Sequence, residues 1–237
     1  MTDFLEQIIG KMGIEFTGEQ FDKIRKYHEL MVETNKVMNL TSITEYNEAV
    51  IKHYADSLAL LPLVNMGKYE SMIDVGTGAG FPGLILKIAC PDIKCTLMDS
   101  LAKRVNFLKE TAQSLGIKDI TIIHSRAEEL GRNPLHRDSY DLAVSRAVAN
   151  LSSLTELCAP FVKVGGDFIS YKATGCEQEI RAAGKAIEKL GCEVDSILDY
   201  TIPDSDITRV FVKISKIYLT PDQYPRRNSL PTKKPIS

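Results

Sequence analysis

The sequence lacks the features that mark several classes of protein. Its five cysteines are scattered and form no C-x-x-C pair, which argues against a disulfide framework or a zinc site and predicts reduced thiols. No apolar run reaches membrane-spanning length, and the first residues are acidic where a signal peptide would be basic. The net charge is −2, so a surface for nucleic acid would have to be local. We expect a protein of the cytoplasm, without a membrane segment and without a metal site.

The most informative stretch that is present is a glycine-rich segment at residues 72–83. Ile73 and Val75 favour a buried strand, and an apolar pattern at helical spacing resumes after residue 83. Between them, Gly76, Gly78 and Gly80 allow a tight turn and the close approach of a ligand. The pattern predicts a strand, a turn and a helix, with free backbone N–H groups at the helix N-terminus where a nucleotide-like ligand can bind.

The periodicity changes near residue 67 and predicts an α/β fold with a helical extension. Residues 1–66 indicate helices, including one that begins at a capping box over Thr17–Gln20 and one over 45–61. Strands alternate with helices over residues 67–217, which predicts a Rossmann-like fold with a mainly parallel, seven-stranded sheet and an antiparallel edge strand. The last two strands, at 195–201 and 208–215, are close enough in sequence to pair antiparallel. Residues 218–237 form a basic, proline-containing tail.

The spacing around the glycines favours a cationic ligand. A dinucleotide fingerprint, G-x-G-x-x-G, would need glycine where Phe81 stands, and Asp74 precedes the first glycine. A carboxylate suits the sulfonium end of S-adenosylmethionine better than a pyrophosphate. Asp99, at the end of the second strand, can accept the ribose hydroxyls, and residues 125–128 follow the third strand where the adenine would lie. Asp74 as a turn cap, Asp99 as a helix cap and Glu128 as a surface residue stay open as structural alternatives.

Several motifs together resemble one protein family. They are Asn39-Leu40-Thr41, His53-Tyr54-x-Asp56-Ser57-Leu58, residues 74–83, Asp99-Ser100 with Arg104 and Phe107-Leu108, Ser145-Arg146-Ala147, and the tail Tyr224-Pro225-Arg226-Arg227 with Lys233-Lys234-Pro235. The chain resembles the glucose-inhibited division protein B family, bacterial methyltransferases of 16S ribosomal RNA. The tail departs from the family pattern, because Asn228-Ser229-Leu230 stands where the family usually has another glycine.

The resemblance implies methyl transfer from S-adenosylmethionine to N7 of a guanine in 16S rRNA, either as naked RNA or within the 30S subunit. The implied cofactor contacts are Asp74, Gly76, Gly78, Phe81, Asp99, Ala127, Glu128 and Arg146. The implied RNA contacts are Lys172, Arg226, Arg227, Lys233 and Lys234. Arg146 is placed at the junction of cofactor and acceptor as the catalytic residue, with a strand-end salt bridge as its alternative.

Guanine N7 carries a lone pair and no proton, so the implied reaction needs no general base. His53 and Asp56 lie three residues apart on one helix face, and we interpret them as hydrogen-bonding groups that fix the N-terminal helices to the sheet. Three other functions stay open: an NAD-dependent oxidoreductase, a methyltransferase with another nucleic-acid or small-molecule acceptor, and a non-catalytic ribosome-binding module. We expect a monomer.

Overall fold

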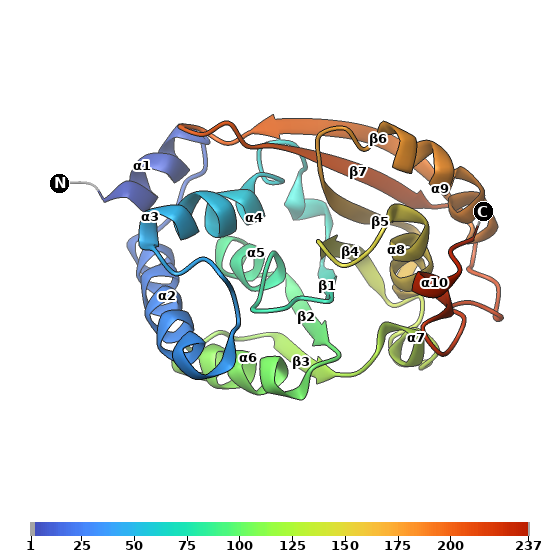
Figure 1. Cartoon of the computed structure of the whole chain (residues 1–237), viewed down its shortest axis with the longest axis horizontal. Coiled ribbons are helices and arrows are strands. Elements are labelled where there is room, and N and C mark those ends of the chain that lie inside the picture. The colour runs from blue at the N-terminus through green and yellow to red at the C-terminus, as the bar shows by residue number, and fades with distance from the viewer. Residues whose placement is uncertain (1–2, 237) are drawn as a thin grey trace.

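A computed structural model describes residues 3–236. Seven strands form one sheet in the order β3-β2-β1-β4-β5-β7-β6 (Figure 1). The strands are β1 (Ser71–Val75), β2 (Lys94–Asp99), β3 (Ile120–His124), β4 (Tyr140–Arg146), β5 (Val162–Ala173), β6 (Cys192–Thr201) and β7 (Thr208–Lys216). The first five strands pair in parallel, whereas β7 runs antiparallel to both β5 and β6. The predicted antiparallel pairing of the last two strands is confirmed.

The central strand β1 sends alternate side chains to two separate cores. Met72 packs on one face with the N-terminal helices, α5 (Gly83–Ala89) and α6 (Ala102–Ser114). Ile73 and Val75 pack on the other face with α8 (Leu151–Cys158) and α9 (Glu177–Lys189). This alternation is the period-2 geometry of a strand that is buried on both faces. The chain order also reverses between β1 and β4, which places a ligand crevice at the carboxyl ends of these strands.

The N-terminal helices pack against the glycine-rich turn. They are α1 (Phe4–Lys11), α2 (Gly18–Met38), α3 (Tyr46–Ala49), η1 (Val50–Ala55) and α4 (Asp56–Leu58), and the short η2 (Met66–Lys68) leads into β1. Both bonds of the predicted capping box are present, between Thr17 and Gln20. The fully buried Tyr27 donates its hydroxyl proton to the carbonyl of Ala79, at 2.6 Å, and so fixes α2 to the turn.

The helix predicted over residues 45–61 is divided in the structure. Its middle, η1, is a π-helix that contains His53, and the short helices α3 and α4 flank it. A π-helix is a locally widened helix that occurs mostly at functional sites. Apolar spacing cannot reveal it, because one extra residue per turn hardly alters the pattern.

The C-terminal segment, residues 217–236, crosses back over the helices on the far side of the crevice. The turn η3 (Ala159–Phe161) leads from α8 into β5, and the last helix α10 (Leu230–Lys233) lies beside α8 and near α7 (Ala127–Leu130) (Figure 1). Within residues 3–236, no helix is long and apolar enough to cross a membrane.

Candidate active site

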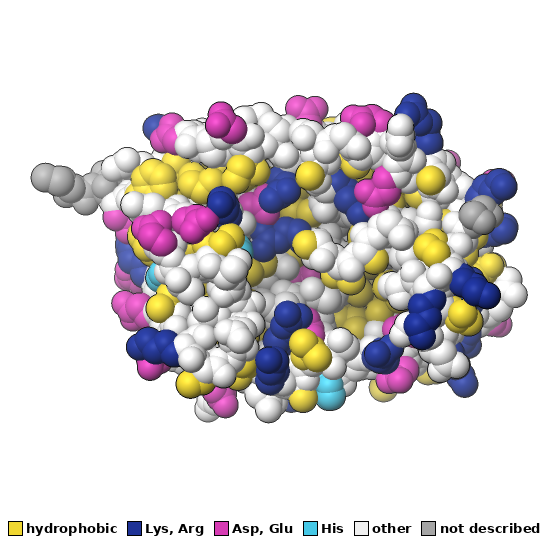
Figure 2. Space-filling view, in the orientation of Figure 1, with side chains coloured by type: hydrophobic (Ala, Val, Ile, Leu, Met, Phe, Trp, Pro, Cys, Tyr) yellow, Lys and Arg dark blue, Asp and Glu magenta, His cyan; other side chains and the backbone are white. Residues whose placement is uncertain are grey.

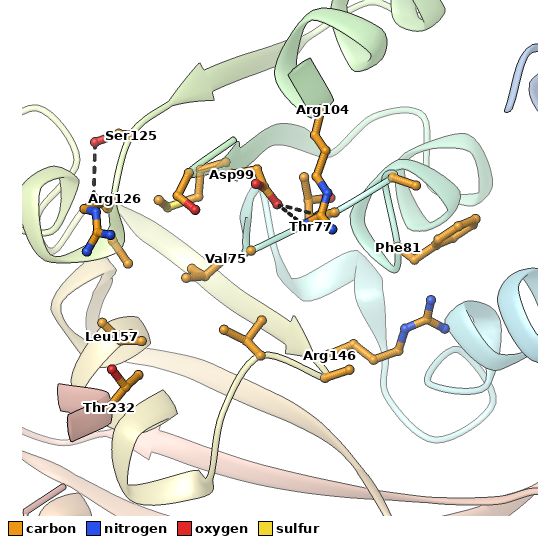
Figure 3. A pocket seen from close by; sticks show the side chains of 18 of the residues that line it. Val75, Thr77, Phe81, Asp99, Arg104, Ser125, Arg126, Arg146, Leu157 and Thr232 are labelled. Carbon is orange, nitrogen blue, oxygen red and sulfur yellow. Dashed lines mark hydrogen bonds and ion pairs between the residues drawn. The ribbon is translucent and has the colours of Figure 1, made fainter. Parts of the chain in front are cut away.

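A cavity of about 550 Å³ opens at the carboxyl ends of β1, β2 and β4. Figure 2 shows the hollow in the middle of this face, with Lys and Arg side chains within it and along its rim. In Figure 3, Phe81 and Arg146 lie at one end of the cavity, and Arg126, Leu157 and Thr232 lie at the other. The turn after β1, the ends of β2 and β4, the start of α7 and the C-terminal segment all contribute to its wall.

The glycine-rich turn forms the floor of this cavity. The sequence predicts free backbone N–H groups here, but in the structure they are bonded within the protein. The N–H groups of Gly76 and Thr77 both donate to the carbonyl of Met98, at 3.0 Å. The N–H of Gly78 donates to Asp99 Oδ2, at 2.9 Å. The N–H groups of Gly80 and Phe81 both donate to the carbonyl of Thr77. A turn whose donors are engaged internally is a poor cradle for phosphate, which favours a ligand without one.

Gly76 contributes space for a ligand, because it has no side chain; it does not contribute a free hydrogen-bond donor. Gly76 has φ +78°, and a Cβ atom there would lie 2.7 Å from the side chain of Val148. Val148 and Gly76 both line the cavity. Any side chain at position 76 would therefore be strained and would project into this crowded part of the wall.

Asp74 lies beneath the turn and not on the cavity wall. Its side chain is fully buried, and Oδ2 accepts a hydrogen bond from the N–H of Gly83 at 2.8 Å. Burial raises the pKa of this carboxyl to about 6, although the Gly83 bond and the charge of Arg146 act in the opposite direction. This placement corrects the expectation that Asp74 faces the cationic end of a ligand and favours the alternative of a cap within the turn.

Asp99 does lie on the cavity wall, at the end of β2. Oδ2 accepts from the N–H of Gly78, and Oδ1 accepts from the N–H of Leu101, at 2.9 Å. The guanidinium of Arg104 lies 3.5 Å away and is a third exposed. The helix-cap alternative is therefore present in the structure, yet each carboxylate oxygen has a further lone pair that can accept from a ribose hydroxyl.

Glu128 and Ala127 line the opposite end of the cavity, at the start of α7. Glu128 is 8% exposed and accepts a hydrogen bond from the N–H of Ser229 at 3.1 Å, so it is not the surface residue of the alternative interpretation. Ser229 and Thr232, both from the C-terminal segment, line the same end.

Arg146 closes the other end of the cavity. Its guanidinium lies over the ring of Phe81, at 5.2 Å from the centroid (Figure 3). His53 stacks on the same ring, with the ring centroids 4.4 Å apart. Arg146 also forms an ion pair with Asp56, a fully buried residue whose second oxygen pairs with Arg209. The salt-bridge alternative for Arg146 is therefore present, and Asp56 ties the N-terminal helices to β4 and β7 as interpreted from the sequence.

A second cavity of about 430 Å³ lies on the far side of Arg146, and we call it the side pocket. It shares His53, Arg146 and Ala147 with the first cavity. Its remaining lining residues are Lys52, Asp56, Tyr171, Lys172, Ala173 and Arg209. Four basic side chains and one carboxylate thus surround it.

The five residues predicted to contact RNA differ in their surroundings. Lys172 lines the side pocket, but its ammonium group donates to Glu179 at 2.6 Å and to the carbonyl of Ala149 at 3.0 Å. Arg226 forms two-pronged hydrogen bonds with the fully buried Glu156, and its own side chain is 28% exposed. This pairing gives Arg226 a partner within the protein, and its assignment as an RNA contact stays a prediction. Arg227, Lys233 and Lys234 are exposed.

Comparison with known proteins places the chain in a family. The family model described as "rRNA small subunit methyltransferase G" (GidB) matches residues 20–208. The chain belongs to this family. Ribosomal RNA small subunit methyltransferase G of Alkaliphilus metalliredigens is 47% identical over 226 residues, which is 95% of each chain. The protein of that name from Listeria monocytogenes is 42% identical over 231 residues, covering 98% of this chain and 97% of that protein.

Solved structures support the fold. M. jannaschii TYW2 in complex with AdoMet has a TM-score of 0.55 at 15% identity, over 74% of this chain and 80% of that chain. The mitomycin 7-O-methyltransferase MmcR has a TM-score of 0.57 at 14% identity, over 80% of this chain and 60% of that chain. With the family shown, the predictions of a Rossmann-like methyltransferase fold, of S-adenosylmethionine as cofactor and of an rRNA methyltransferase as enzyme class are confirmed.

The residues present fit that cofactor. The cavity is large enough for a nucleoside with a side chain, its floor has no Cβ at Gly76, and Asp99 and Glu128 offer carboxylates towards a cationic, phosphate-free ligand. S-adenosylmethionine supplies an electrophilic methyl group on its sulfonium. The chain's own residues bind and orient the two reactants and exclude water between them.

Several residues of these cavities have no role that could be predicted from the sequence. Arg104 enters only through the family resemblance, and Arg209 belongs to none of the motifs identified from the sequence. Ser229 and Thr232 carry no charge and follow no periodic pattern, so nothing in the sequence marks them as cavity residues. Their position results from the path of the C-terminal segment, which only the folded structure shows.

Proposed function

We propose that the protein methylates N7 of a guanine in 16S rRNA, with the cofactor in the first cavity and the target nucleotide in the side pocket. The observation that carries this proposal is the common wall of the two cavities, formed by His53, Arg146 and Ala147. A methyl group must pass directly from one ligand to the other, so the two binding sites have to meet. They meet at Arg146.

The charge of the side pocket suits a nucleotide. Lys52, Arg146, Lys172 and Arg209 contribute positive charge, and Asp56 contributes one negative charge. Asp56 engages the Nε of Arg209 and one Nη of Arg146. A guanidinium has five N–H donors, so both arginines retain donors for a phosphate or for guanine O6. In this arrangement Arg146 positions the acceptor and leaves N7 free to attack.

The groups around the junction are consistent with transfer that needs no general base. Burial, and then the charge of Arg146, lower the pKa of His53 to about 4, so its imidazole is neutral at pH 7 and a weak proton acceptor. Its Nε2 is in any case 2.8 Å from the hydroxyl of Thr41. Because N7 carries no proton, alignment is the main requirement, and alignment can contribute about 7–11 kcal/mol in favourable cases.

The RNA outside the pocket would contact the exposed basic residues of the C-terminal segment. Arg227, Lys233 and Lys234 are exposed and lie on the segment that borders the first cavity. We propose these three residues, together with Lys172 in the side pocket, as phosphate contacts. We further propose that the protein acts as a monomer in the cytoplasm on 16S rRNA, as naked RNA or within the 30S subunit.

Methylation of the two forms of substrate tests this function. Isolated 30S subunits and naked 16S rRNA, both from cells without the enzyme, are incubated with radiolabelled S-adenosylmethionine, and the RNA is digested to nucleosides. We expect label in 7-methylguanosine, and none with the Gly76→Arg variant as a control. Label in another nucleoside would show another acceptor, and an absence of label from both substrates would support a non-catalytic ribosome-binding module.

A further inference from the structure

The C-terminal segment, residues 217–236, is held on the domain by buried and charged contacts. The side chain of Arg132 donates to the carbonyls of Gln223 and Pro225, at 2.7 and 2.9 Å. The side chain of Arg137 donates to the carbonyls of Thr220 and Tyr224, at 2.6 and 2.9 Å. Two arginines from the connection between α7 and β4 thus bind the backbone of the segment. These bonds fix the path of the segment and do not involve the side chains of the segment.

One ion pair secures the middle of the segment. Glu156, on α8, is fully buried, and both of its oxygens accept from Arg226, at distances of 2.6 to 3.1 Å. The backbone N–H of Arg226 donates to the same carboxylate at 2.7 Å. A two-pronged arginine–carboxylate pair fixes geometry as well as charge, and removing one partner leaves a buried charge uncompensated.

The segment reaches the cavity directly beyond this ion pair. The fully buried Ser153 donates its hydroxyl proton to the carbonyl of Pro231, at 2.7 Å, which fixes α10 against α8. Ser229 accepts from Arg126 at 2.8 Å through its hydroxyl and donates to Glu128 through its N–H. In Figure 3, Thr232 and Leu157 point into the cavity from the side opposite Phe81. Ser229 and Thr232 are therefore wall residues of the first cavity.

We infer that the C-terminal segment is a cofactor-binding element, which closes the end of the cavity at Glu128 through Ser229 and Thr232 and is positioned by Arg226. The inference rests on the placement of S-adenosylmethionine in this cavity and not on the identity of the acceptor. The end of the cavity away from Arg146 holds the part of the cofactor remote from the methyl group, which is the adenine base of the adenosine. Without the segment, Glu128 would lose its hydrogen bond from Ser229, and the adenosine would be open to solvent on one side.

Two pairs of variants test the inference by the affinity for S-adenosylmethionine, measured by calorimetry without RNA. Thr232→Trp fills the cavity from the segment, and we expect it to weaken binding at least tenfold, about 1.4 kcal/mol. Thr232 and its neighbour Lys233 are both exposed, but Lys233 does not line the cavity, so Lys233→Trp should leave affinity within about twofold. Arg226→Ala releases the segment and should weaken binding about tenfold, whereas Arg227→Ala should have almost no effect.

Protection from trypsin gives a second readout, which a merely structural role would not change. Bound cofactor should slow cleavage after Arg227 and Lys233 in the wild type, because it contacts the segment that carries them. It should give less protection in Thr232→Trp. Wild-type affinity in Thr232→Trp, together with cleavage that the cofactor does not slow, would overturn the inference. Should Arg226→Ala fail to fold, Thr232→Trp and the protection assay decide the question alone. Since none of these measurements uses RNA, their failure is distinguishable from a failure to form 7-methylguanosine.

Discussion

The two cavities that meet at Arg146 are each organised around a buried carboxylate, but they differ in what surrounds it. Asp99, in the first cavity, accepts from two backbone N–H groups and forms one ion pair, with Arg104 at 3.5 Å. Asp56, in the side pocket, is paired with two guanidinium groups, and two lysines line the same pocket. Asp99 therefore keeps lone pairs that can accept from the hydroxyl groups of a cofactor, whereas Asp56 serves to hold two guanidinium groups at the side pocket. The role of each carboxylate thus depends on its partners and not on the acid itself.

The largest expected effect is a loss of cofactor affinity when a side chain at position 76 blocks the first cavity. Gly76→Arg combines strain at φ +78° with a side chain at the crowded floor, and we expect cofactor affinity to fall by about 1,000-fold or more. Calorimetry with S-adenosylmethionine measures it. Gly184→Arg is the matched control, because that glycine lies in α9 with no atom within 4 Å of its Cβ position. Unchanged affinity in Gly76→Arg would refute the cofactor site.

The second prediction concerns the carboxylate of the side pocket. Asp56→Asn leaves Arg146 and Arg209 without their shared counter-charge, and we expect the free energy of unfolding to fall by about 3 kcal/mol. Urea denaturation at pH 7 measures the loss. Glu48→Gln removes the carboxylate of an exposed pair with Lys52 and should cost less than about 1 kcal/mol. Equal losses in the two variants would show that Asp56 does not bind the helices to the sheet.

The third prediction uses two groups whose pKa values are shifted in opposite directions. The pKa of His53 is lowered to about 4 in the folded protein, so its contribution to stability is complete above pH 6.5 and is lost as the pH falls towards 4. The pKa of Asp74 is raised to about 6, so its contribution is complete below pH 3.8 and is lost as the pH rises through 6.

Urea denaturation from pH 4 to pH 7 tests these signs. Relative to the wild type, His53→Phe should gain roughly 2 kcal/mol as the pH falls, and Asp74→Asn should gain roughly 2 kcal/mol as the pH rises. Parallel curves for the wild type and both variants would contradict the two assignments.

The smallest expected effect lies on the rim of the side pocket. Lys52→Glu reverses an exposed charge there, and we expect the affinity for 16S rRNA to fall about tenfold with a shallower salt dependence. Cofactor affinity should stay constant, because Lys52 does not line the first cavity. Lys36→Glu, on an exposed turn of α2 outside both cavities, is the control in filter-binding assays. A loss of cofactor affinity equal to the loss of RNA affinity would remove the distinction between the cavities.

Features set by neighbours in sequence were predictable, and features set by distant partners were not. The strand, turn and helix around Gly76 follow from residue types within a dozen positions, and Asp99 follows from its place at a strand end. The pairing of Arg226 with Glu156 joins residues 70 positions apart, so the charge pattern of the tail alone could not reveal it. The N–H groups of Gly76, Thr77 and Gly78 illustrate the same limit, since their acceptors Met98 and Asp99 lie on the next strand.

A crystal structure of the protein with S-adenosylhomocysteine and guanosine 5′-monophosphate, both at saturating concentration, tests the division of the site most directly. We predict the nucleoside thioether in the first cavity, and the guanine in the side pocket with its phosphate near Lys52 and Arg209. Guanosine monophosphate bound elsewhere on the surface, with the side pocket empty, would contradict the account.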